Sequence, residues 1–369
     1  MNELEYKQIV KNLISPYLKN KRIGLTELAK LSGGVTPIDL VEILELKSNP
    51  QNSKILSNSA SLNLEANPLD FDWRFDSKTI DDVSNLLVQN HSKIGCFGVP
   101  SVFTKLVKTH DIVLFDINPF LKDEFKPYED KIVELDINRK VISGFEFDAI
   151  VMDPPWYNDY YLLWFKQAIN NLKLGGKIYV SKYPSLLRPT AIEDWIAIQD
   201  EIGNFLGTAE KKMILTYETP VFENETLFSL GFNNVGNWRM AELVSYELKH
   251  KTPQTLILKE NHLWKRYRFG NMVVSLIVQD EDCDEIKISS PYSDGTYTLK
   301  SVSRRHFVRN RINFLTSRNQ ALIIRGTKKV DVFLQYLNQN QITTELLNNK
   351  FSKEELKSLN IIQSIIGSI

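Results

Sequence analysis

The segment Asp153-Pro154-Pro155-Trp156, which follows the apolar run 148–152, has the residue types for a specific chemistry. Each proline keeps the residue before it out of the helical region, so the chain after the run is held extended. Neither proline has an N–H, which leaves the Asp153 carboxylate and the carbonyls of Asp153 and Pro154 as a cluster of acceptors. Such a cluster fits an exocyclic amino group, and Trp156 or Tyr157 can stack on the ring that carries it. Drawing the amino protons toward these acceptors localises the nitrogen lone pair for attack on a sulfonium methyl group.

This tetrapeptide resembles the catalytic Asp-Pro-Pro-Trp motif of adenine-N6 methyltransferases, which include the messenger-RNA adenosine enzymes. Residues 93–246 resemble the wider group of N6-adenine-like methyltransferases, some of which methylate protein lysines. The resemblance implies a class I methyltransferase that depends on S-adenosylmethionine, with a Rossmann-like seven-stranded core.

The pattern around the motif agrees with an α/β fold, because short apolar runs alternate with segments of helical periodicity. Such alternation is typical of a parallel sheet covered by helices on both faces. We predict strands at 93–97, 112–115, 131–135, 148–152, 177–180, 213–216 and 241–246, and helices at 101–109, 159–172 and 191–205.

Open parallel sheets bind ligands beyond the carboxyl ends of their strands, so the loop after the first strand is a candidate cofactor site. Gly95 and Gly98 allow the backbone to approach a cofactor, and Ser101 can cap the next helix. The N6-adenine-like group has a similar Pro-Ser step at Pro100 and Ser101. We expect Gly95, Phe97, Gly98, Pro100 and Ser101 to hold S-adenosylmethionine.

Other strand ends carry further candidates. The resemblance implies that Asp116, after the second strand, accepts both ribose hydroxyls of the cofactor. It places Asp136 beside the cofactor adenine, although an ordinary loop acid is an equal alternative. Tyr157 is expected to cover the acceptor group. Lys182, after the fifth strand, is either a contact for a substrate phosphate or carboxylate, or a solvated lysine.

The composition is that of a globular chain with no excess of either charge, since its 369 residues include 45 Lys and Arg and 45 Asp and Glu. No apolar run of eighteen residues appears and the amino end is acidic, which predicts a cytoplasmic protein with no membrane partner. Cys96 and Cys283 match no metal spacing, so we expect neither a disulfide nor a metal site.

The segments that flank the core differ in character. Residues 1–48 resemble a helix-turn-helix or winged-helix unit with Thr36 as a helix cap, but Asp39, Glu42 and Glu45 make a poor face for DNA, which favours a dimerisation or docking element. We predict a linker at 49–70, the methyltransferase domain at 71–250 and an accessory region at 251–369.

The accessory region is basic, because residues 261–330 contain 13 Lys and Arg against 6 Asp and Glu. Arginine suits phosphate, so Arg304, Arg305, Arg309 and Arg311 are candidate contacts for a nucleic acid or an acidic protein. The first expectation is therefore methylation of adenine N6 in DNA or RNA. A protein-lysine methyltransferase and a catalytically silent, nucleic-acid-binding methyltransferase fold remain alternatives, and a homo- or hetero-oligomer fits all three.

Overall fold

The computed structural model describes residues 1–18, 23–46, 62–232, 235–258, 264–279, 285–303 and 306–367. Arg304, Arg305 and Cys283, and positions 49–61 of the predicted linker, lie outside these ranges.

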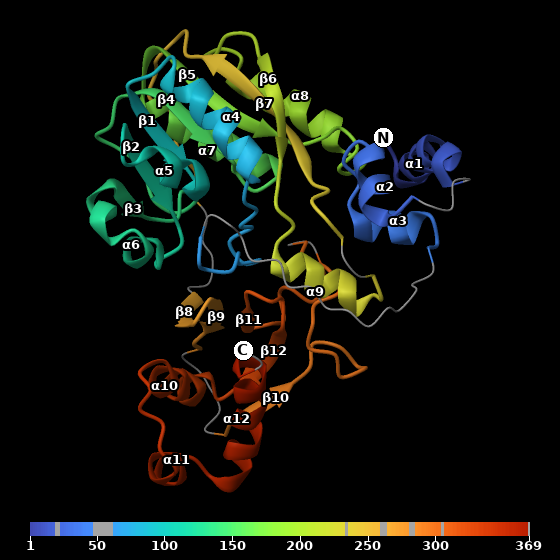
Figure 1. The fold of residues 1–369 in the computed structure, drawn as a ribbon, viewed down its shortest axis with the longest axis vertical. Helices are drawn as coiled ribbons and strands as arrows, with labels where there is room; N and C mark the ends of the chain where they lie inside the picture. Colours follow the sequence, from blue (N-terminus) through green and yellow to red (C-terminus); the bar gives the residue numbers. More distant parts are fainter. Residues whose placement is uncertain are drawn as a thin grey trace.

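A seven-stranded sheet forms the centre of the largest unit, in the order β3-β2-β1-β4-β5-β7-β6 (Figure 1). The first five strands of that order are parallel, and β7 runs antiparallel to β5 and to β6. This confirms the predicted Rossmann-like α/β class. The strands are β1 (Lys93–Phe97), β2 (Asp111–Asp116), β3 (Ile132–Glu134), β4 (Phe147–Met152), β5 (Leu172–Lys182), β6 (Glu210–Thr216) and β7 (Met240–Glu247).

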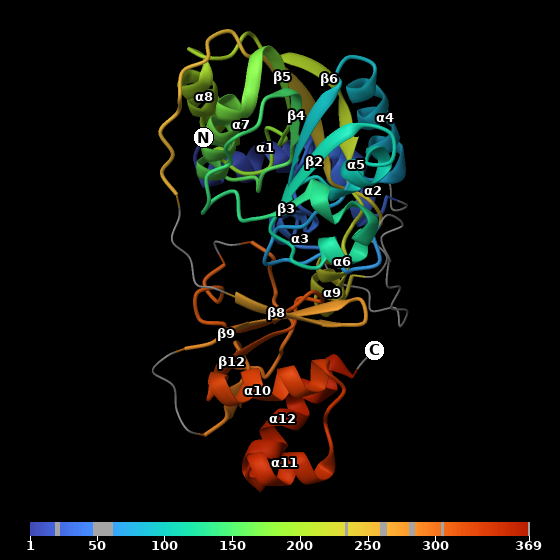
Figure 2. The same cartoon turned by 90° about the vertical axis from the view of Figure 1, so that its left-hand side faces the viewer.

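Helices cover both faces of this sheet, as the apolar strands require. Figure 2 shows α4 (Ser77–Val88) and α5 (Pro100–Leu106) on one face, and α7 (Asn158–Asn171) and α8 (Ala191–Ile202) on the other. The short α6 (Leu121–Glu124) and the 3₁₀ turn η1 (Lys126–Lys131) join β2 to β3. The predicted start of the fifth strand at Lys177 is too late, because β5 pairs with β4 from Leu172 across an irregularity in register.

The amino-terminal helices pack on the large unit. They are α1 (Glu3–Leu18), α2 (Leu25–Leu31) and α3 (Pro37–Ile43), and Thr36 caps α3 as predicted by accepting from the Asp39 N–H at 3.1 Å. Their apolar residues share one core with Leu227, Val235 and Trp238, next to α9 (Val221–Ser229).

The carboxyl-terminal region is a second unit with its own core. Its five strands are antiparallel in the order β10-β12-β11-β9-β8. The sequence analysis did not predict this sheet. The elements are β8 (Trp264–Phe269), β9 (Met272–Ile277), β10 (Lys287–Ser289), β11 (Phe314–Thr316), β12 (Ala321–Arg325), α10 (Thr327–Asn338), α11 (Thr344–Lys350) and α12 (Lys353–Ile366).

Residues 62–74, which we call the strap, run between the two units. Leu62 and Leu64 are buried, and the Glu65 N–H donates to the Asn271 carbonyl at 2.9 Å. Residues 62–70 of the predicted linker 49–70 are thus packed against the folded body. Their Asn- and Ser-rich neighbourhood resembles a linker, but their apolar side chains belong to the folded body.

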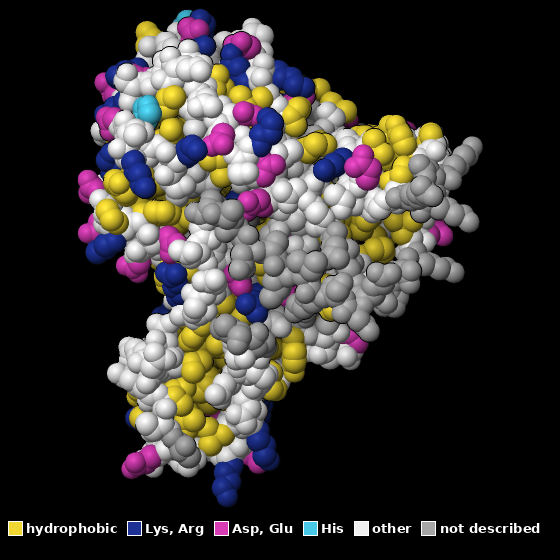
Figure 3. Space-filling model, in the orientation of Figure 1, with side chains coloured by type: hydrophobic (Ala, Val, Ile, Leu, Met, Phe, Trp, Pro, Cys, Tyr) yellow, Lys and Arg dark blue, Asp and Glu magenta, His cyan; other side chains and the backbone are white. Residues whose placement is uncertain are grey.

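On the face shown in Figure 3, the described Lys and Arg side chains lie among Asp and Glu, and no broad area has one sign. None of the helices in the described ranges is long and apolar enough to cross a membrane. Those ranges also contain no group of three or more His, Cys, Asp or Glu arranged to hold a metal ion.

Candidate functional site

A cavity of about 770 Å³ opens where the carboxyl ends of β1 to β4 face the strap and the carboxyl-terminal sheet. All three parts contribute charged or polar residues to its wall. They include Asp116, Asp136 and Asp153 from the large unit, Asp70, Asp72 and Arg74 from the strap, and Arg266, Arg309 and Asn310 from the carboxyl-terminal unit.

Asp153 follows β4, and its carboxyl group is held by two hydroxyl donors. The Tyr217 hydroxyl donates to Oδ1 at 3.0 Å, and Ser181, near the end of β5, donates to the same oxygen. Burial raises the pKa of Asp153 to about 6, while the hydrogen bond from Ser181 and the charge of Arg239 act in the opposite direction. Asp153 is therefore an acceptor carboxylate at neutral pH.

The two prolines form a turn that leads into α7. Pro155 lies in the cavity wall, whereas Pro154 is buried behind it. The Tyr157 N–H donates to the Pro155 carbonyl at 2.6 Å, so that carbonyl is occupied within the protein.

Trp156 does not lie where the sequence analysis expected a stacking platform. Its side chain is only 6% exposed and is absent from the cavity wall, and the guanidinium of Arg239 covers its ring at 3.6 Å from the centroid. A hydrogen bond from Trp156 instead helps to hold down the pKa of Asp153. The aromatic residues in the cavity wall are Phe71, Trp73, Phe115, Tyr160, Trp164 and Trp264. The ring of Tyr157 packs against those of Phe71 and Tyr160 at 5.8 and 6.2 Å.

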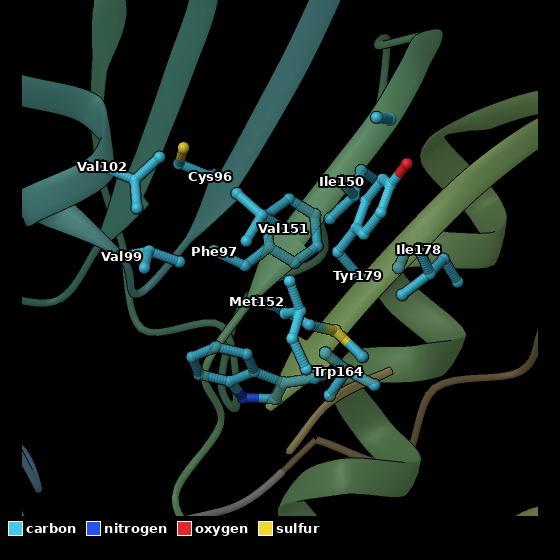
Figure 4. Packing of buried hydrophobic residues seen from close by; sticks show 14 of the residues in the cluster. Cys96, Phe97, Val99, Val102, Ile150, Val151, Met152, Trp164, Ile178 and Tyr179 are labelled. Carbon is cyan, nitrogen blue, oxygen red and sulfur yellow. The ribbon is translucent and has the colours of Figure 1, made fainter. Parts of the chain in front are cut away.

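Only part of the first loop predicted to hold the cofactor lines the cavity. Gly98 and Pro100 line the cavity. Gly98 has φ +63°, and a Cβ there would lie 2.7 Å from the ring of Trp164. Figure 4 shows Trp164 beside Phe97 and Met152 below the strand ends. Only glycine allows this approach without strain.

Three other residues predicted to hold the cofactor lie behind the wall. Gly95 is inside β1, where a Cβ would meet the Phe147 ring at 3.0 Å, and Phe97 is a fully buried core residue. Ser101 is buried and does not cap α5, whose cap position is Val99. β1 ends at Phe97 as predicted, so the turn that faces the cavity starts at Gly98 and leaves Gly95 inside the strand.

Asp116 and Asp136 both reach the cavity, as their positions after β2 and β3 predict. The Asn118 N–H donates to Asp116 Oδ1 at 2.9 Å. Burial raises the pKa of Asp116 to about 7, and the nearby carboxylates of Asp70 and Asp72 add to the effect. Asp136 Oδ1 accepts from the Asn138 N–H at 2.8 Å and from its side-chain amide at 2.9 Å, so this oxygen also orders its own loop.

These residues fit the S-adenosylmethionine that the sequence resemblance implies. Gly98 leaves room at the β1 turn for close approach of the donor, and Asp116 offers carboxylate oxygens to ribose hydroxyls. The volume is within the range of cofactor pockets, about 300–1,000 Å³.

The arginines of the carboxyl-terminal unit mostly serve the junction between the units. Arg266 pairs with Asp70, Arg318 pairs with Glu65 at 2.9 Å, and Arg309 donates to the Pro68 carbonyl at 3.0 Å. The sequence analysis missed these strap partners because charge counts do not reveal partners distant in sequence. Their positive charge is therefore not an open nucleic-acid surface.

Of the other residues predicted to contact the substrate, one lines the cavity and two lie outside its wall. Arg309 lines the cavity, whereas Arg311 is exposed outside its wall. Lys182 pairs with Glu242 at 3.6 Å, lies over Trp195 and does not reach the cavity.

Comparisons with known proteins concern the family and the fold. Residues 71–227 match the model of a family described as probable N6-adenine methyltransferase. The branched-chain polyamine synthase of Thermus thermophilus, solved with N4-aminopropylspermidine and 5'-methylthioadenosine, has a TM-score of 0.52 at 11% identity, covering 71% of this chain and 97% of that chain. Its C9 mutein has a TM-score of 0.50 at 10% identity with the same coverage. At these identities the likeness is one of fold. No curated protein matches the sequence.

Proposed function

We propose that this S-adenosylmethionine-dependent N-methyltransferase acts on the exocyclic amino nitrogen of adenine in DNA or RNA. The observation that carries the proposal is the position of the Asp153 carboxyl group, which lies in the wall of the same cavity as Gly98 and Asp116. The family matched by residues 71–227 supports adenine as the acceptor.

Asp153 orients the amine. Ser181 and Tyr217 both donate to Oδ1 and fix the plane of the carboxyl group, so we assign Oδ2 to the amino hydrogen of the acceptor. When bound, S-adenosylmethionine supplies an electrophilic methyl carbon, and its sulfur keeps the electron pair of the bond that breaks. Asp153 holds the nitrogen lone pair in line with that carbon and stabilises the positive charge that develops on nitrogen. The methylated amine is acidic enough to release its extra proton to water.

The acceptor ring needs an aromatic neighbour other than Trp156. We assign this role to Tyr160 and Phe71, because both line the cavity while Trp156 is covered by Arg239. Base stacking on such side chains contributes about 1–3 kcal/mol per base.

The test is transfer of labelled methyl groups to DNA and RNA oligonucleotides, followed by digestion and mass spectrometry of the nucleosides. We expect N6-methyladenine, with no label on matched oligonucleotides that carry hypoxanthine in place of adenine. Asp153→Asn should lower the rate at least about a hundredfold while leaving the affinity for S-adenosylhomocysteine within about threefold. Asp159→Asn is the matched control, since Asp159 is an exposed acid at the start of α7.

Parallel reactions with a lysine-rich protein and with spermidine separate the other acceptors. Label on either one, and none on adenine, would replace the adenine assignment. Absence of S-adenosylhomocysteine binding by the folded protein would instead favour a catalytically silent fold that binds nucleic acid.

A further inference from the structure

Arg239 lies just before β7, and its own guanidinium cation sits between two indole rings next to the acceptor carboxylate. Its guanidinium carbon lies 3.6 Å from the ring centroid of Trp156 and 4.2 Å from that of Trp73. The ring of Tyr217 is 5.5 Å away. Arg239 lies beyond residues 71–227, so the family match does not reach it.

Two connections join Arg239 to Asp153. Its backbone carbonyl accepts from the Tyr217 N–H at 3.1 Å, and the hydroxyl of the same tyrosine donates to Asp153 at 3.0 Å. Its positive charge also acts directly on the carboxyl group, because it opposes the rise in the pKa of Asp153 that burial causes.

The Nε–H of Arg239 is buried and donates no hydrogen bond within the described residues. The aromatic faces therefore solvate much of the charge, as in a cation–π cage. Two buried acids, Asp153 and Glu223, act electrostatically on Arg239, and both raise its pKa. Burial raises the pKa of Glu223 to about 7.

We propose that Arg239 is a positioning and specificity residue, which holds Trp156 and the Asp153 carboxylate for the acceptor and whose fixed charge admits a neutral amine while excluding an ammonium group. The inference rests on the proposed function, because it explains why that site would select adenine over lysine or a polyamine. Aromatic rings beside a carboxylate are a ready cage for an ammonium ion, and here the protein fills that cage with its own side chain.

The other groups that face this pair do not supply the same charge. Burial raises the pKa values of Tyr161 and Tyr217 well above 10, so both phenols are neutral. Glu223 changes its charge near neutral pH, which adds a second, weaker influence on Arg239.

The first experiment measures binding and requires no substrate. Calorimetry at pH 7.5 should show that Arg239→Ala binds methylguanidinium and n-butylammonium, that the wild-type protein binds neither, and that Arg239→Ala combined with Asp153→Asn loses at least about tenfold in affinity for both. Arg239→Gln replaces Arg239→Ala if the alanine variant lacks a cooperative melting transition. A folded variant that binds neither cation would overturn the cage.

The second experiment measures the pH dependence of methyl transfer to adenine. Arg239→Gln should move the acidic midpoint upward by about one pH unit, because an opposite charge nearby lowers a carboxyl pKa by roughly 1–3 units. Arg239→Lys keeps the positive charge, so its acidic midpoint should stay close to that of the wild type. Lys300→Gln is the matched control: Lys300 lies over Tyr292 at 4.7 Å in the carboxyl-terminal unit and is not among the main influences on the pKa of Asp153. Equal midpoints in the wild type and Arg239→Gln would refute the positioning role.

The two experiments separate this inference from the proposed function. Cation binding by Arg239→Ala in a protein that never methylates adenine would contradict the acceptor while leaving the cage intact. Adenine methylation with no cation binding by the folded variants would contradict the cage alone.

Discussion

Asp116→Asn should have two opposite effects: weaker binding of S-adenosylmethionine and a higher melting temperature of the protein without it. The side chain lies at the end of β2 in the cavity wall, where burial raises its pKa from 3.8 to about 7. A carboxyl group whose pKa is higher in the folded state favours folding when it is protonated. Its contribution is therefore fully present below pH 4 and is lost as the pH rises from 4 to 7.

The shift sets the size of the stability effect. Three pKa units at about 1.4 kcal/mol each correspond to roughly 4 kcal/mol at pH 8. This value is an upper limit, because water in the cavity solvates the carboxylate. Asparagine keeps an oxygen for the Asn118 N–H but carries no charge, so Asp116→Asn recovers part of that energy.

Donor binding changes in the other direction. Hydrogen bonds to a charged group contribute about 1.5–3 kcal/mol, so removing the carboxylate should weaken binding by about ten- to a hundredfold. In the wild type, affinity should fall by up to about tenfold per unit as the pH drops below 7, because protonated Asp116 is a poorer acceptor for the ribose hydroxyls. In Asp116→Asn this dependence should be absent.

Calorimetric titration with S-adenosylhomocysteine between pH 6 and 8.5 measures binding, and thermal melting at pH 8 measures stability. Asp111→Asn is the control, since Asp111 is exposed at the other end of β2. An Asp116→Asn protein that melts at or below the wild-type temperature and keeps wild-type affinity would refute this reasoning.

Three further changes test other parts of the structure. Gly98→Ala should destabilise the protein by about 2–4 kcal/mol in urea unfolding, because φ is +63° and the new Cβ would meet the Trp164 ring at 2.7 Å; unchanged stability would mean that the loop adjusts freely. Glu65→Ala should cost about 3 kcal/mol, because it leaves the half-buried Arg318 without its carboxylate; a loss below about 0.5 kcal/mol would contradict a structural role for the strap. The methylation rate of the wild type should fall with unit slope below about pH 6 as Asp153 is protonated; a rate that stays constant down to pH 5 would exclude its carboxylate as the acceptor.

The acidic edge of the site could be predicted from local sequence. An apolar run followed by Asp153 and two prolines indicates a buried strand that ends in a polar turn, and the same reasoning applies to Asp116 and Asp136. Because carboxyl ends of parallel strands meet at one edge, these three acids had to converge once the strand order was recognised.

The partners across the cavity could not be predicted in this way. The composition of the strap and its neighbours is typical of a linker. Its burial depends on a carboxyl-terminal sheet that is remote in the chain, which composition does not reveal. The charge of Arg266 and Arg318 is visible in the sequence, but the acids that neutralise it lie in the strap.

Trp156 also shows the difference between what local sequence predicts and what distant contacts decide. Its place after the prolines follows from the sequence, but whether its ring faces a ligand depends on Arg239, which only the packing of β7 beside β5 brings to it. Sequence alone thus determined which groups stand at the strand ends, since hydrophobic periodicity and proline geometry act over a few residues. Tertiary structure decided which of these groups remain open to a ligand, because burial and charge neutralisation depend on contacts between distant segments.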